Sequence, residues 1–180
     1  ILHRLHELSS PTLSADQQLL ALRALAVCCV RLGRPDPVAS GRFIARWDPR
    51  YPSPDARVNQ ALCEMLVYLE STNVVRKTLP LLATAGTQEE KLHYLCMLSL
   101  VKAGWSLDER RACFDWLGRA RREFSGASML PTALNYFRAD AEATLSTAER
   151  AALADTLAAL DLAAAPAPAP APTRRFVKEW

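Results

Sequence analysis

Two pairs of residues have the spacing at which a helix could bring reactive side chains together. His3 and His6 stand three positions apart, and so do His93 and Cys96. The first pair could supply two metal ligands, and the second could supply a nucleophile and its base. We expect neither chemistry, because no third histidine lies near His3 and His6, and the apolar neighbours of Cys96 would raise the pKa of its thiol.

A group of arginines between positions 110 and 122 could contact the phosphates of a nucleic acid. On a helix beginning near Leu107 they would be scattered around the polar side and interrupted by acidic residues. The chain has 22 basic and 19 acidic residues and a formal net charge of only +3, which is not typical of a nucleic-acid-binding domain. We therefore prefer a solvated helix face and keep nucleic-acid binding as the alternative. The arginines are Arg110, Arg111, Arg119, Arg121 and Arg122.

The sequence offers no other catalytic, cofactor-binding or metal-binding motif. Neither a Gly-x-Gly-x-x-Gly loop nor a Gly-Lys-Ser/Thr loop occurs, and the five cysteines are irregularly spaced within apolar patterns, which favours small buried side chains. The longest dense apolar window, residues 92–101, is about half of what a membrane span needs. The chain starts without Met or a signal-peptide pattern, so we expect a segment of a longer protein.

Helical periodicity runs along most of the chain, and strand-like alternation is nowhere sustained. Start signals recur, and each predicts a helix that ends at a glycine, a proline-rich loop or the next signal. Pro80 falls inside one pattern and predicts either a kink or a later start of that helix. The start signals are Ser14 with Gln17, Asp36, Ser53 with Pro54, residues 71–73, Thr87 with Glu90, Ser106 with Glu109, about Ser128, and Ser146 with Glu149; the predicted ends include Gly33, Arg46, Gly104 and Leu162.

The start signals form two interleaved series. Ser14, Ser53 and Thr87 are 39 and 34 residues apart, while the signals near Asp36, Ser71 and Ser106 are 35 residues apart. Such periods are typical of stacked helix pairs. We predict an all-α fold over residues 1–162, a right-handed α-solenoid of HEAT/armadillo-like helix pairs, with an irregular helical bundle as the alternative.

The composition changes abruptly after Leu162. Residues 163–173 are almost wholly alanine and proline, which favours an extended polyproline II spacer on the order of 30 Å long. A spacer implies something beyond it, and we expect residues 174–180 to begin a following segment.

Several strings along the chain resemble one family. They look like the HEAT-like helical region of large exported proteins from planctomycete-type bacterial genomes, which are described as membrane-bound dehydrogenases or c-type haem-binding proteins. The strings include residues 21–27, 31–35, 45–52, 66–69, 77–82, 87–90, 102–105 and 176–180.

The resemblance implies a function for this segment. In that family the helical region lies between an upstream domain and a downstream c-type cytochrome domain. We therefore expect a non-catalytic scaffold that bridges domains of a redox protein, which would be periplasmic or otherwise exported. Its partners would be the neighbouring domains of the same chain, and haem would bind outside these residues. No Cys-x-x-Cys-His motif occurs, and Cys28-Cys29 lacks its spacing, so no haem-binding residue carries over.

Overall fold

The computed structural model describes residues 13–126 and 128–162, and within these ranges it contains helices and no strand. This confirms the all-α prediction. The helices are α2 (Ala15–Leu32), α3 (Pro37–Trp47), η1 (Asp48–Arg50, a 3-10 turn), α4 (Ala56–Tyr68), α5 (Val74–Thr84), α6 (Gln88–Ser99), α7 (Leu107–Glu123), α8 (Leu130–Ala143), α9 (Thr147–Ala152) and α10 (Ala154–Leu162).

Local capping chemistry sets most helix starts where it was predicted. The side-chain hydroxyls of Ser14, Ser106 and Ser146 each accept a hydrogen bond from the backbone amide three residues on. The side chain at that position accepts one from the backbone amide of the serine. These reciprocal bonds satisfy amides that a first helical turn leaves free. Thr87 caps α6 through one bond only, because the Glu90 carboxylate accepts from the Tyr94 hydroxyl at 3.2 Å instead.

Two predicted helix boundaries are wrong. Asp55, and not Ser53, caps α4: its carboxylate accepts from two backbone amides, while Asn59 holds the Ser53 backbone outside the helix with two hydrogen bonds. The helix expected to reach Gly104 ends at Ser99. Gly104 has φ +84° and an added Cβ would lie 2.9 Å from the Thr72 carbonyl oxygen, so this glycine serves a tight loop approach.

The last predicted helix is divided. One helix was expected from Ser146 to Leu162, but α9 ends at Ala152 with Leu153 as its cap, and α10 begins at Ala154. Leu153, Leu157 and Leu160 are all buried, and α10 packs against α7. The break therefore turns the chain so that all three leucines face the core.

Pro80 lies within α5 and does not delay its start, since α5 begins at Val74. The Thr84 hydroxyl donates to the Pro80 carbonyl at 2.9 Å. Asn73 precedes the helix but makes no side-chain cap, because it donates instead to the Asp48 carboxylate at 3.3 Å.

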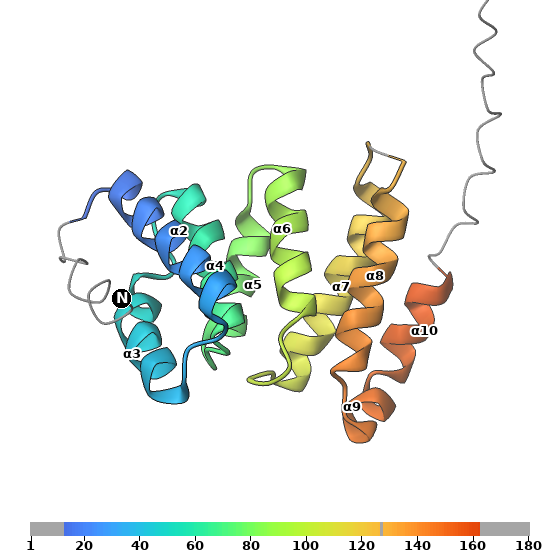
Figure 1. The fold of residues 1–180 in the computed structure, drawn as a ribbon. Helices are drawn as coiled ribbons and strands as arrows, with labels where there is room; N and C mark the ends of the chain where they lie inside the picture. Colours follow the sequence, from blue (N-terminus) through green and yellow to red (C-terminus); the bar gives the residue numbers. More distant parts are fainter. Residues whose placement is uncertain (1–12, 127, 163–180) are drawn as a thin grey trace, which may run out of the picture.

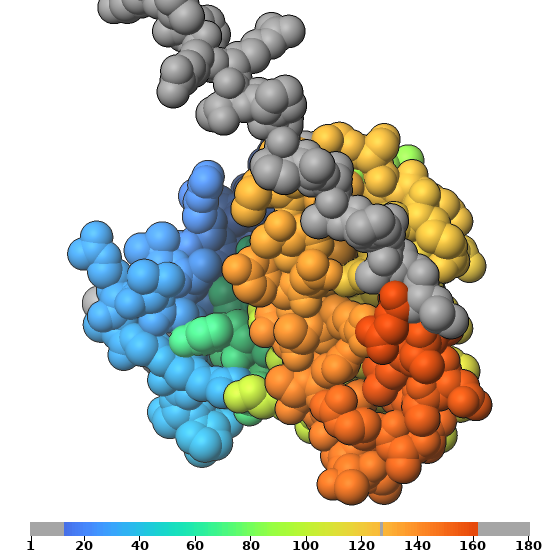
Figure 2. Space-filling view, turned by 90° about the vertical axis from the view of Figure 1, so that its right-hand side faces the viewer, coloured from blue at the N-terminus to red at the C-terminus, as the bar shows by residue number. Residues whose placement is uncertain are grey.

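The helices form a row that runs from α2 to α10 (Figure 1). Helix α4 contacts both α2 and α6, α6 also contacts α8, and α7 contacts both α5 and α10. Figure 2 faces the far end of the row, where α10, in red, lies beside α8 and α9, in orange. Consecutive helices from α3 to α8 also contact one another.

Buried side chains from every part of the row make one continuous apolar core. Helix α4 contributes the most completely buried residues, with Val58, Leu62 and Leu66 all at 0% exposure, because it lies between α2 and α6. Its position between two neighbouring helices explains why it is buried on more than one side.

Several sequence predictions lie outside the described residues: the His3 and His6 pair, the spacer at residues 163–173 and the segment 174–180. Among the described helices, none combines the length and the apolar character that crossing a membrane requires.

Candidate interaction groove

Three adjoining cavities follow one face of the row across α2, α4, α6 and α8; we call them together the groove. The first, about 670 Å³, lies over α2, α4 and α6. The second, about 650 Å³, shares Glu64, Tyr68 and Met97 with it. The third, about 460 Å³, shares Leu100 and Lys102 with the second and reaches α8. The shared lining residues make the three hollows one continuous surface.

The groove is lined by apolar side chains that remain accessible. Val30 of α2, Tyr68 of α4 and Leu100 beyond α6 are exposed and lie in successive cavities. Met65 and Met97 contribute flexible thioether side chains to the first cavity. Such a surface, apolar and adaptable, is suited to bind apolar groups of another protein segment.

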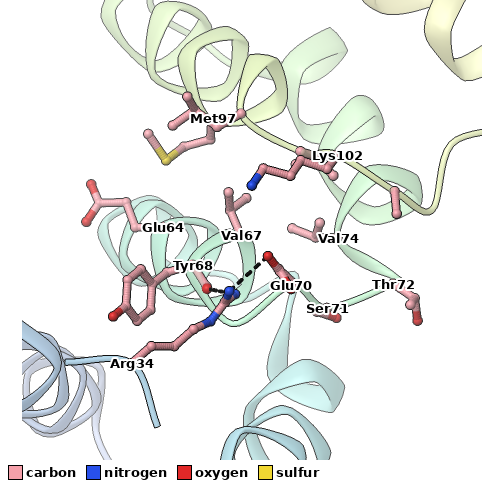
Figure 3. Close-up of a pocket in the computed structure, with 13 residues that line it drawn as sticks. Arg34, Glu64, Val67, Tyr68, Glu70, Ser71, Thr72, Val74, Met97 and Lys102 are labelled. Atoms are coloured by element: carbon pink, nitrogen blue, oxygen red, sulfur yellow. Dashed lines mark hydrogen bonds and ion pairs between the residues drawn. The ribbon is translucent and has the colours of Figure 1, made fainter. Parts of the chain in front are cut away.

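An ion pair crosses the second cavity (Figure 3). The Arg34 guanidinium reaches from the segment after α2, with Nη1 2.9 Å from Glu70 Oε1, donates to the Tyr68 carbonyl, and lies 5.6 Å from the Tyr68 ring centroid. Lys102 enters the same cavity from the opposite side, toward Val67. Side-chain exposures of 42% for Arg34 and 60% for Glu70 leave both charges open to solvent or to a partner.

Glu70 holds an unfavourable backbone conformation. Its φ is 60°, in the left-handed region that glycine usually occupies at a helix end. The Ser71 amide donates to Leu66 and the Glu70 amide to Val67, which closes α4 in the manner of a Schellman motif. The charged side chain of Glu70 therefore stands at a position where glycine would have a lower backbone free energy.

The His93 and Cys96 pair lies on α6, near the groove, but lacks the features of an active nucleophile. His93 Nδ1 is 3.8 Å from Glu64 Oε1, and its buried Nε2 has no hydrogen-bond partner among the described residues. Burial, followed by the charges of Asp140 and Glu64, raises the pKa of the Cys96 thiol. A raised pKa reduces the thiolate that nucleophilic catalysis would need.

The arginines between 110 and 122 do not gather into one basic surface. Arg110 is buried, and it donates to Thr144 at 2.7 Å and to Glu149 at 3.4 Å. Arg111 pairs with Asp108 on its own helix, and Arg121 donates to Asn135. Arg110 is therefore not available to a phosphate, which weakens the nucleic-acid alternative.

Arg110 serves instead to join the C-terminal helices. Its guanidinium stands 4.6 Å from the Trp105 ring and also donates to the carbonyls of Lys102 and Thr144. Burial lowers its pKa, while the nearby Glu149 opposes that change. These bonds fix the start of α7 to the turn between α8 and α9.

A second buried polar cluster joins the N-terminal helices. Asp48 at the start of η1 accepts from Lys77 Nζ at 2.7 Å and from the Ser71 hydroxyl at 3.0 Å. The side chains of Asp48 and Lys77 are only 11% and 20% exposed. The next residues along the chain make a second contact. The Tyr51 hydroxyl, after η1, is 2.7 Å from the Thr78 hydroxyl on α5, and burial raises the pKa of Tyr51.

The cysteines, and the tryptophans that lie among the described residues, are packed as structural side chains. No disulfide joins the five cysteines, all of which lie in the described part of the chain; Cys29, Cys63 and Cys113 are buried. Burial raises the pKa of Cys63 to about 11 and that of Cys113 to about 12. Trp47 is buried, Trp105 donates to the Val101 carbonyl at 2.9 Å, and Trp116 lies between Lys91 and Arg119.

The groove has no signal in the sequence that predicts it. The steps from Ala61 to Glu64 and Tyr68 place these residues on one helix face, but periodicity does not show whether another helix covers that face. The left-handed Glu70 had no signal, since neither glycine nor asparagine stands there.

The sequence and fold were compared with models of protein families, with curated proteins and with solved structures, and none of the three comparisons found a match.

Proposed function

We propose that the chain is a right-handed α-solenoid of HEAT/armadillo-like helix pairs that acts as a non-catalytic interaction scaffold. The contacts of α4 with α2 and α6, and of α7 with α5 and α10, support this reading. In a repeat stack each helix pair packs on its neighbours along the row and leaves an extended face free. An irregular bundle would use more contacts between helices distant in the chain.

The groove carries the proposal. A continuous apolar surface across four helices, with exposed charges at Arg34, Glu70 and Lys102, can hold a segment of another domain. The backbone cost at Glu70 supports a role in recognition, because stability alone would favour glycine there.

The partner that we propose is a neighbouring domain of a longer, exported redox protein. This part rests on the resemblance of the sequence strings to the helical region of the bacterial dehydrogenase and cytochrome proteins. The segment would position those domains and bind no haem itself.

Binding of the flanking domains tests this function. The domains that neighbour the segment in the longer protein are produced as separate chains, and their affinity for the 180-residue chain is measured by calorimetry. Leu100→Glu places a charge in the groove, and we expect it to weaken binding about tenfold or more.

The matched control is Leu107→Glu. Leu107 is 38% exposed against 48% for Leu100, and it lines none of the three cavities. We expect it to bind within about twofold of the unaltered chain. Equal weakening by both variants, absence of binding, or catalytic turnover by the purified chain would contradict the proposal.

A further inference from the structure

Helix α3 and the turn after it carry three arginines at steps of four residues. Arg42 is exposed, and Arg46 and Arg50 are half-buried. A step of four residues is about 6 Å along a helix axis and keeps side chains on one face. The Arg50 side chain lies back along the helix, because its Nη1 donates to the Arg46 carbonyl at 3.0 Å. We call these three residues the arginine stripe.

The arginine stripe is separate from the groove. Helix α3 lies at the α2 end of the row (Figure 1) and packs on α4 and η1. None of the three arginines lines any of the three groove cavities. A ligand of the stripe would therefore contact a different part of the molecule.

The arginine stripe has no counter-charge within residues 13–126 and 128–162. None of the ion pairs formed there includes one of its arginines. The only acidic residues between positions 17 and 54 are Asp36 and Asp48. The Asp36 carboxylate caps α3 by accepting from the Ala39 amide, and the Asp48 carboxylate belongs to the buried cluster with Lys77. Both nearby carboxylates are thus engaged elsewhere.

Arg46 shows what this arrangement costs the chain. Its Nε is buried and has no hydrogen-bond partner among the described residues. Burial, followed by the charge of Arg50, lowers the pKa of Arg46. Like charges one helical turn apart also destabilise a helix. A partner that supplied carboxylates to the stripe would reduce this cost.

We propose that the arginine stripe binds an acidic helix of another protein or domain, whose carboxylates stand at steps of four residues. Such carboxylates are also about 6 Å apart, so each can pair with one guanidinium, and the planar guanidinium fork matches a carboxylate. Val38, one turn before Arg42, is 65% exposed. The partner helix would therefore carry an apolar side chain one turn beyond its carboxylates.

A nucleic acid fits the arginine stripe less well. The aromatic residues beside the stripe, Trp47 and Tyr51, are 3% and 1% exposed, so neither offers a ring on which a base could stack. The formal net charge of the whole chain is only +3, and three arginines would neutralise few phosphates. The stripe therefore favours a short acidic segment of protein.

A designed peptide tests the proposal. It is alanine-based and about 18 residues long, which allows it to form a helix. It carries three glutamates at steps of four and a leucine one turn beyond each end of that series. Fluorescence anisotropy at low salt measures its affinity for the 180-residue chain. A control peptide has the same composition, but its glutamates lie on three different helix faces, and we expect it to bind at least about fivefold more weakly.

The double variant Arg42→Gln/Arg46→Gln should weaken binding of the designed peptide about fivefold or more, because two ion pairs are lost. The matched control is Arg119→Gln/Arg122→Gln, which removes two exposed arginines from α7. We expect this control to bind within about twofold of the unaltered chain. Leu100→Glu, in the groove, should also bind the peptide within about twofold. Its result separates this proposal from the proposed function.

Absence of peptide binding, equal affinity for the two peptides, or equal weakening by the two double variants would overturn the proposal. Weakening by Leu100→Glu would place the peptide in the groove and would also contradict it. A single-stranded oligonucleotide and an anionic phosphatidylserine vesicle are tested with the same variants. If either binds more tightly than the designed peptide and loses affinity in Arg42→Gln/Arg46→Gln, the stripe is a phosphate site and the proposal is wrong.

Discussion

Two ion pairs of similar length differ in how far they are buried. Asp48 and Lys77 are 2.7 Å apart and largely buried, while Arg34 and Glu70 are 2.9 Å apart and largely exposed. The buried pair satisfies further polar groups and ties η1 to the start of α5. The exposed pair lines the groove. Breaking the enclosed pair should therefore be costly for stability, whereas the open pair contributes little to it and is the one that the proposed partner could reach.

The largest effect is expected when the buried pair is broken. Asp48→Ala removes the carboxylate that accepts from the Lys77 ammonium, the Ser71 hydroxyl and the Asn73 amide, and leaves the ammonium only the backbone carbonyl of residue 48. We expect the free energy of unfolding to fall by about 3–5 kcal/mol. Chemical denaturation measures it, with Glu70→Gln as the exposed counterpart, for which we expect a loss below about 1 kcal/mol. Similar losses for the two variants would remove the distinction between the pairs.

Arg110 extends the comparison to the C-terminal helices. Arg110→Met keeps much of the apolar stem but removes the bonds to Thr144 and Glu149. We expect a loss of about 2–4 kcal/mol, because partly buried acceptors lose a charged donor. The neighbouring Arg111→Met removes an exposed pair with Asp108 and should cost under about 1 kcal/mol. If Arg110→Met were as mild as Arg111→Met, Arg110 would not join these helices.

A substitution at Glu70 tests the exposed ion pair. Glu70→Gly relaxes the left-handed backbone and removes an exposed ion pair, so we expect the free energy of unfolding to rise by up to about 1 kcal/mol. The same variant should bind the flanking domains more weakly, which calorimetry measures. A large loss of stability would mean that Glu70 serves the fold and not recognition.

The smallest expected effect depends on pH. Hydrogen bonds from Ser146, followed by the charge of Arg110, hold the pKa of Glu149 below its ordinary value of 4.5. A lowered pKa in the folded state stabilises above the unfolded pKa, and this contribution is lost as the pH falls through the folded pKa. The free energy of unfolding decreases as the pH falls. We expect this decrease to be smaller in Glu149→Gln than in the unaltered chain, by less than about 1 kcal/mol.

Denaturation curves between pH 6 and about pH 3 measure this effect. Glu123→Gln on α7 is the control, because that exposed carboxylate lies outside the Arg110 cluster. An identical acid-side slope for Glu149→Gln and the unaltered chain would contradict the expected coupling.

The helices and most of their starts follow from short-range sequence patterns. Ser14, Ser106 and Ser146 were predicted as caps from residues only three positions apart, because capping satisfies backbone groups within one helical turn. The same local logic failed at Ser53, because Asn59 holds the Ser53 backbone and Asp55 caps the helix instead. It also failed at Leu153, where burial against α7 decides that the helix turns.

Which polar and apolar residues are buried depends on long-range contacts. Asp48 meets Lys77 across 29 positions, and Arg110 meets Glu149 across 39, so no local pattern separates them from exposed residues of the same type. The groove likewise depends on which faces α2, α4, α6 and α8 leave uncovered. Helix formation follows from neighbours along the chain, whereas burial depends on partners that the chain brings together only when it folds.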